Sequence, residues 1–338
     1  MKKRIVAALL ALVFLLGLVG TAYGEGEDAA ALVAEGLGYW FGTGADGYDM
    51  KKAQEAFQKA VDLGSAEGWY WLGELFYYGV EEGHIEQAYA CYEKAAELGS
   101  AYGLFGMGEL CRTGEVVPQD YEKAIDYYRQ AIEGGCHLAY VSMGYLYELG
   151  DSVPQDGQKA IEWYQKAADS EDWVARNTAR YYLGALYEAG AEGLEPDEAK
   201  ALEWYRLAAD EGFGDAFTCL GYLEPDEVKA AEWYAKAAAC GLPYNLAGCY
   251  ATGTGVEQDW DRAIELFRSS EDGGEDAEQC LALLALLYLQ GDIVPADQGT
   301  ARDYALRCFT MVGVDPALVQ SGDYGIYLAK WVLDQLDA

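Results

Sequence analysis

The chain has 338 residues, long for one compact core, and 52% of them are hydrophobic, so either two folded domains or an array of repeats is expected. Only 7 prolines occur, while alanine, glutamate, leucine and tyrosine are plentiful, which favours helices. The 57 acidic and 23 basic residues give a net charge of −34, which argues against nucleic acid or anionic lipid as a partner and fits a cationic partner, a polyvalent cation or simple solubility.

The first residues have the layout of an export signal. Three basic side chains follow the first methionine, an uncharged apolar run extends from Ile5 to Val19, and small residues precede Glu25. This layout predicts a secretory signal peptide over residues 1–24 and an exported protein, with periplasm, cell surface and medium left open. An uncleaved anchor is the alternative, although the run is short for a membrane span of ~20 residues.

A first repeated mark is a Leu-Gly pair, or a Leu-Ala or Met-Gly variant of it. Its second residue lies at Gly38, Gly73, Gly108, Gly144, Gly184, Gly221, Ala247 and Ala285. A further glycine follows six residues later in every unit except the sixth, at Gly44, Gly79, Gly114, Gly150, Gly190, Gly253 and Gly291. Internal repetition at this period is typical of solenoid proteins.

A second mark is Asp-x-x-Lys-Ala or a close variant, followed by an aromatic pair and then by alanines. It begins at Asp49, Asp120, Asp156, Asp197, Asp226, Asp259 and Asp297, and His84 takes the aspartate place in the second unit. A glycine closes most units, at Gly64, Gly99, Gly134, Gly212 and Gly241.

The two marks predict a pair of helices in each unit, as the fourth unit illustrates. Apolar residues lie at helical spacing on both sides of Gly150, which is expected to end the first helix in a left-handed conformation. Asp156 is expected to cap the second helix, a contribution of ~1 kcal/mol. Eight such hairpins would stack into an α-solenoid, an all-α fold.

The pattern resembles the Sel-one-like repeat family, a relative of the tetratricopeptide repeat. The resemblance rests on Leu183-Gly184 with Tyr187 and Gly190, and on the full second mark at Asp156 to Ala168. It covers residues 30 to 313 and implies a solenoid over 25–313. A segment over 314–338, with a helix from Tyr324 to Leu336, is expected to cap the array.

Two departures from the repeat are visible. The sixth unit passes from Leu223 to Pro225-Asp226 and so lacks most of its interhelix turn, and the fourth-to-fifth interval carries extra residues near Glu171 to Asn177. Both are expected to change the packing locally.

Eight cysteines allow two interpretations. Some relatives in the family carry a regular cysteine pair in each unit, which this chain does not show. Cys91 with Cys111, and Cys280 with Cys308, are plausible disulfide pairs for an exported protein. Cysteine as a small buried apolar residue is the alternative, and both interpretations stay open.

The sequence offers no recognisable catalytic or ligand-binding motif. The two histidines, His84 and His137, lack partners at metal-ligand spacing, and no phosphate-binding loop occurs. Some Sel-one-like proteins are described as penicillin-binding or weakly β-lactam-hydrolysing, but the Ser-x-x-Lys and Lys-Thr-Gly motifs of that chemistry are missing. We therefore predict no enzyme, no metal site and no cofactor.

Tetratricopeptide relatives bind ligands on the concave face that their first helices line, and the resemblance carries that face over to this chain. The positions selected are Tyr70, Glu74, Tyr77, Phe105, Glu109, Arg112, Tyr145, Glu148, Tyr181 and Glu188. Aromatic groups beside carboxylates suit a basic or amphipathic peptide.

The leading hypothesis is an exported, non-catalytic scaffold that binds a protein or peptide on this concave face. One alternative is a hydrolase acting on cell-wall or β-lactam chemistry. Another is a peptidoglycan-binding module without catalysis. Family resemblance supports the fold far better than the function.

Overall fold

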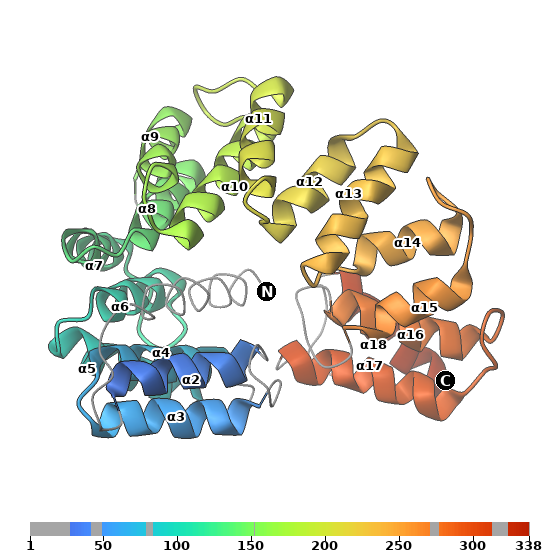
Figure 1. Cartoon of the computed structure of the whole chain (residues 1–338), viewed down its shortest axis with the longest axis horizontal. Coiled ribbons are helices and arrows are strands. Elements are labelled where there is room, and N and C mark those ends of the chain that lie inside the picture. Colours follow the sequence, from blue (N-terminus) through green and yellow to red (C-terminus); the bar gives the residue numbers. More distant parts are fainter. Residues whose placement is uncertain are drawn as a thin grey trace. The chain divides into compact units, whose positions relative to one another are not determined.

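The computed structural model describes residues 28–41, 49–78, 84–151, 153–270, 277–312 and 324–337, and these are almost entirely helical (Figure 1). The first helices of the units are α2 (Ala29–Phe41), α4 (Ala66–Tyr78), α6 (Ala101–Thr113), α8 (Leu138–Leu149), α10 (Trp173–Ala189), α12 (Gly214–Leu223), α14 (Tyr244–Thr252) and α16 (Ala277–Gln290). The second helices are α3 (Met50–Asp62), α5 (His84–Glu97), α7 (Tyr121–Glu133), α9 (Gly157–Ala168), α11 (Glu198–Ala209), α13 (Glu227–Ala239), α15 (Trp260–Arg268) and α17 (Gln298–Val312), and α18 (Tyr324–Asp337) follows them. The predicted signal peptide lies outside the described residues.

The helices form two compact units, which we call the N-terminal unit (to Trp204) and the C-terminal unit (from Tyr205). Outside the fifth repeat, the first and second helices of a repeat pair with each other, and α3, α5, α7, α9, α13 and α15 also contact the first helix of the next repeat. In the N-terminal unit, α4, α6 and α8 lie on one side of the layer and α5, α7 and α9 on the other (Figure 1). The predicted all-α solenoid architecture is therefore confirmed.

The second helices begin where the aspartates predict. In five of them the side chain of the capping aspartate accepts a hydrogen bond from the backbone N–H three residues on, as Asp156 does from Lys159 at 3.0 Å. Asp197 and Asp297 accept the same bond from the backbone N–H of Lys200 and of Thr300. These bonds satisfy amides that have no partner within the helix, so these seven second helices have a defined start.

A close approach of two helices explains the glycine of the first mark. A Cβ atom added at Gly73, Gly108, Gly144 or Gly221 would lie 2.4–2.7 Å from a tyrosine ring of the second helix in the same repeat. The four rings belong to Tyr92, Tyr128, Tyr164 and Tyr234. No side chain fits in that space, so glycine is required where the ring packs.

One predicted glycine contact is wrong in register. A Cβ added at Gly38 would meet nothing within 4 Å, whereas one at Gly36 would lie 2.5 Å from the ring of Phe57. The first repeat therefore places its contact two residues earlier. Gly134 closes α7 as predicted, with a right-handed backbone at φ −81°, and Gly135 after it has the left-handed backbone at φ +93°.

The two predicted departures have structural counterparts. The short turn of the sixth repeat leaves only Glu224 to Asp226 between α12 and α13. Gly255, in the turn after α14, approaches the start of α13 so closely that an added Cβ would lie 2.0 Å from the carbonyl oxygen of Glu227. The extra residues before the fifth repeat lengthen α10 at its start, which Asp172 caps through Val174 and Ala175.

The end of the chain and the cysteines also bear on the predictions. Helix α18 packs against α16 and α17 and buries Ile326, Ala329 and Val332, as expected of a closing helix. All eight cysteines are free thiols in this structure, so neither candidate disulfide pair is joined. Cys91 is buried, and burial raises the pKa of its thiol to about 12, so it behaves as an apolar core residue.

The glycine contact can be tested with one substitution at two sites. Gly108→Ala forces a methyl group against the ring of Tyr128, so we expect the free energy of unfolding to fall by about 1–3 kcal/mol in urea titrations. Gly38→Ala is the matched control within a helix, and we expect stability to be unchanged or to rise by up to about 1 kcal/mol. Equal effects at the two glycines would contradict the packing argument.

Candidate functional site

The predicted binding residues lie on the first helices of the N-terminal unit, but they are not equally accessible. Tyr70 and Glu74 are buried, with 2% and 7% of their surfaces exposed. Tyr77, Phe105, Tyr145 and Tyr181 are half-buried, and Glu188 is exposed. The accessible part of the predicted surface therefore runs over α4, α6, α8 and α10, and we call it the first-helix surface.

Tyr70 is corrected from a contact residue to a core residue. Its ring packs against Trp71, Tyr92 and Tyr102 at centroid distances of 5.1–5.9 Å. Burial, assisted by the nearby Glu74 carboxylate, raises the pKa of Tyr70 well above its ordinary value. A partner cannot reach this side chain, because rings of its own repeat and of the next repeat cover it.

Glu74 is corrected in the same way, because a second-helix tyrosine covers and binds it. The hydroxyl of Tyr92 donates a 2.6 Å hydrogen bond to Glu74 Oε1. The same bond recurs at 2.6 Å from Tyr128 to Glu109 and from Tyr164 to Glu148. Each of these tyrosines thus fixes a carboxylate of its own first helix.

Glu109 is the centre of a charge-paired cluster on the first-helix surface. It accepts hydrogen bonds from Arg112 Nη2 at 2.7 Å, Arg112 Nε at 3.1 Å and Ser142 Oγ at 2.8 Å, besides that from Tyr128. Burial alone would raise the pKa of Glu109, but the charge of Arg112 and these bonds together lower it. The pair is therefore charged at neutral pH and fixed in one geometry.

Aromatic contacts connect this cluster to the next two first helices. The guanidinium of Arg112 lies 5.5 Å from the centroid of the Tyr145 ring, an arrangement that cation–π attraction stabilises. The Tyr145 ring meets Tyr182 edge-on at 6.1 Å, and Tyr182 stacks on Tyr164 at 5.5 Å. Tyr181 meets Tyr182 edge-on at 5.5 Å. The result is a continuous aromatic and charged surface over α6, α8 and α10.

Three residues of this surface were missed by the sequence analysis. Tyr182 and Ser142 lie outside the fixed positions carried over from the relatives, and Tyr128 was assigned only to packing. The sequence did contain a signal for Tyr128, because the aromatic pair repeatedly includes a tyrosine and the preceding helix carries a glutamate.

The described residues show no arrangement typical of a metal centre or of a membrane span. No group of three or more His, Cys, Asp or Glu side chains is placed to hold a metal ion in this part of the chain. No helix within the described ranges is long and apolar enough to cross a membrane. His84 packs beside Phe76 and His137 beside Tyr140, at centroid distances of 5.4 and 6.2 Å.

Comparison with protein families gives a match over most of the sequence. The Sel1 repeat model matches residues 28–65, 66–100, 101–136, 137–172, 178–213, 219–242, 244–275 and 279–307. The chain belongs to the Sel1 repeat family. The short sixth match and the gap before residue 178 coincide with the two departures described above. Sel1 repeat solenoids are typically protein-interaction scaffolds and are generally non-catalytic.

Several solved structures are similar to this Sel1 repeat chain. A Sel1 repeat protein from Oxalobacter formigenes is 23% identical over 97% of this chain and 94% of its own, with a TM-score of 0.53. Yeast Tom70 is 15% identical over 98% of this chain and 70% of its own, with a TM-score of 0.61. A protective antigen of uropathogenic Escherichia coli with an SLR fold is 25% identical over 96% and 71%, with a TM-score of 0.49. No curated protein matches the chain.

The tyrosine–glutamate bond of the Sel1 repeats can be tested with conservative variants. Tyr128→Phe keeps the ring on Gly108 but removes the donor to the charged Glu109, so we expect a loss of about 1.5–3 kcal/mol in the free energy of unfolding. Tyr234→Phe is the control, because Tyr234 packs on Gly221 in the same way and no hydrogen bond to a carboxylate is seen for it among the described residues. We expect its effect to be below about 0.5 kcal/mol.

Proposed function

We propose that this protein is an exported scaffold that binds a protein or peptide partner on the concave, first-helix surface of its N-terminal unit. The observation that carries the proposal is the continuous surface of half-buried aromatic rings around the Glu109–Arg112 pair. Aromatic and arginine side chains held in place at a protein surface are typical centres of binding energy.

The rigidity of this surface supports binding. Glu109 has four hydrogen bonds from three neighbouring side chains, and Glu148 is held by Tyr164. Side chains already fixed before binding lose little conformational freedom when a partner arrives. The surface is therefore preorganised to contact another macromolecule.

The charge of the surface favours a basic or amphipathic partner. Arg112 is balanced by Glu109, so it adds no net positive charge. Glu115 and Glu188 are exposed at its edges, and the whole chain is strongly acidic. A basic segment would be attracted to such a surface and would find aromatic rings on which to pack.

Affinity capture with matched triple variants tests the surface. Extracts of envelope and culture medium are passed over the immobilised protein, and a retained protein is identified, purified and titrated by calorimetry. We expect Tyr77→Ala, Tyr145→Ala and Tyr181→Ala together to weaken its binding by more than about tenfold. The control combines Tyr89→Ala, Tyr127→Ala and Trp163→Ala, which are equally half-buried on second helices. Equal loss in both triples, or in neither, would show that the partner binds elsewhere.

Export is tested by the N-terminus of the protein made from the full gene in a bacterial host. The signal layout leads us to expect recovery outside the cytoplasm with Glu25 as the first residue, as read by N-terminal sequencing. Replacing Leu9, Leu10 and Leu12 with Asp breaks the apolar run and should retain the uncut chain inside the cell. Recovery of the uncut chain from the medium would contradict cleavage.

A further inference from the structure

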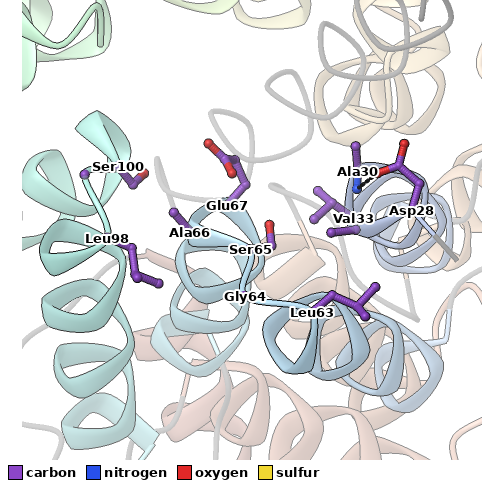
Figure 2. A pocket seen from close by; sticks show the side chains of 12 residues that line it. Asp28, Ala30, Val33, Leu63, Gly64, Ser65, Ala66, Glu67, Leu98 and Ser100 are labelled. Atoms are coloured by element: carbon purple, nitrogen blue, oxygen red, sulfur yellow. Dashed lines mark hydrogen bonds between the residues drawn. The ribbon is translucent and has the colours of Figure 1, made fainter. Parts of the chain in front are cut away.

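A second surface of the N-terminal unit has features that the repeat fold does not require. A cavity of ≈650 Å³ lies against the turns that join successive repeats, lined on one side by the start of α2 and on the other by the turn that follows α5 (Figure 2). The turn from Leu63 to Glu67 lies between them. All its lining residues belong to the first two repeats, at the opposite end of α4 and α6 from Tyr77 and Arg112.

Two leucines of this cavity are exposed although the turn does not need them. Leu63 and Leu98 precede the left-handed Gly64 and Gly99, and 53% and 50% of their surfaces are exposed. At the same place before a left-handed glycine, other repeats have Gly134, Glu211 and Cys240. Because the turn accepts such different side chains, its geometry does not explain why both leucines line one cavity.

The charged groups of the cavity are all acidic. Asp28 and Glu67 are exposed, and no lysine, arginine or histidine lines the cavity. Asp28 accepts a hydrogen bond from the backbone of Ala30 at 3.1 Å, but no partner is seen for the carboxylate of Glu67 among the described residues. A cation brought beside Glu67 would give this carboxylate a partner of opposite charge, which the described residues do not provide.

Backbone donors complete the surface. Ser65 Oγ accepts from Gly68 N at 3.0 Å and so satisfies one first-turn amide of α4. The amides of Ala66 and Glu67 precede any acceptor within the helix, as the first amides of a helix do. They can donate to the carbonyl oxygens of an extended chain lying in the cavity.

We propose that this cavity is a second docking site, for an extended segment of another protein in which lysine or arginine alternates with aliphatic residues. The aliphatic side chains pack on Leu63 and Leu98, the cationic groups pair with Glu67 and Asp28, and the segment's carbonyls accept from the start of α4. The site is separate from the first-helix surface and does not depend on the function proposed for it.

The probe is a fluorescein-labelled, capped hexapeptide of alternating lysine and leucine, whose binding to the purified protein is followed by anisotropy in physiological salt. We expect the double variant Leu63→Ala with Leu98→Ala to weaken binding of the probe by about tenfold. Separately, we expect Glu67→Gln to weaken it by about threefold. Leu149→Ala with Leu207→Ala controls for loss of exposed leucine. Glu122→Gln controls for charge, because Glu122 is also an exposed second residue of its helix, α7. Binding of the probe to both of these control variants should match its binding to the unmodified protein.

Two further probes distinguish a built site from general attraction to an acidic surface. A lysine–serine hexapeptide keeps the positive charge and loses the aliphatic side chains. A glutamate–leucine hexapeptide keeps the aliphatic side chains and replaces the positive charge with negative charge. Both should bind at least about tenfold more weakly than the lysine–leucine probe. Equal binding of either peptide, or equal weakening by the control variants, would overturn the proposal.

Discussion

The contact between a second-helix aromatic ring and a first-helix glycine fixes the distance between the two helices of a repeat. With an added Cβ only 2.5 Å from the ring at Gly108, the helices cannot be drawn closer or carry a larger side chain there. The same tyrosine then places its hydroxyl 2.6 Å from a carboxylate on the first helix. One side chain therefore sets both the core packing and the position of a charged group on the first-helix surface, so the surface is as rigid as the core beneath it.

The last repeats show that the ring and the glycine change together. Where Ala247 replaces glycine, the aromatic residue on the second helix is Phe267, which has no hydroxyl. Where Ala285 replaces glycine, the corresponding place holds Ala305, so two small side chains share the space. The aromatic contact of that repeat is instead between Tyr304 and Tyr288, whose rings stack at 5.8 Å. Among the described residues, the tyrosine–carboxylate bond occurs in repeats that keep both tyrosine and glycine, although the sixth repeat keeps Gly221 and Tyr234 without it.

Features that depend on neighbours in the sequence could be predicted, and those that depend on neighbouring repeats could not. The aspartate caps need only the local backbone, and the structure places them where the motif predicts. The register of Gly36 against Phe57 depends on how α2 lies on α3, and the sequence spacing pointed to Gly38 instead. Tyr70 was selected by its position relative to the Leu-Gly pair, but Tyr102 of the next repeat covers its ring. Positions counted along one helix cannot show which residues the next repeat buries. For the same reason they did not select Tyr182, which stacks on Tyr164 from the following repeat.

The acidic charge is distributed differently over the two surfaces of the N-terminal unit. On the first-helix surface, Glu109 is neutralised by Arg112 and bound by Tyr128, so what remains for a partner is mainly aromatic. At the cavity between the turns, the carboxylate of Glu67 lies near the exposed Leu63 and Leu98, and no basic side chain lines the cavity to balance its charge. Helix α4 carries both surfaces, with Glu67 at its start and Tyr77 in its last turn, ten residues apart and hence separated by about 15 Å along the axis. A partner that engages both surfaces gains affinity from effective concentration alone, because the helix holds the two sites at a fixed separation that a short extended segment can span.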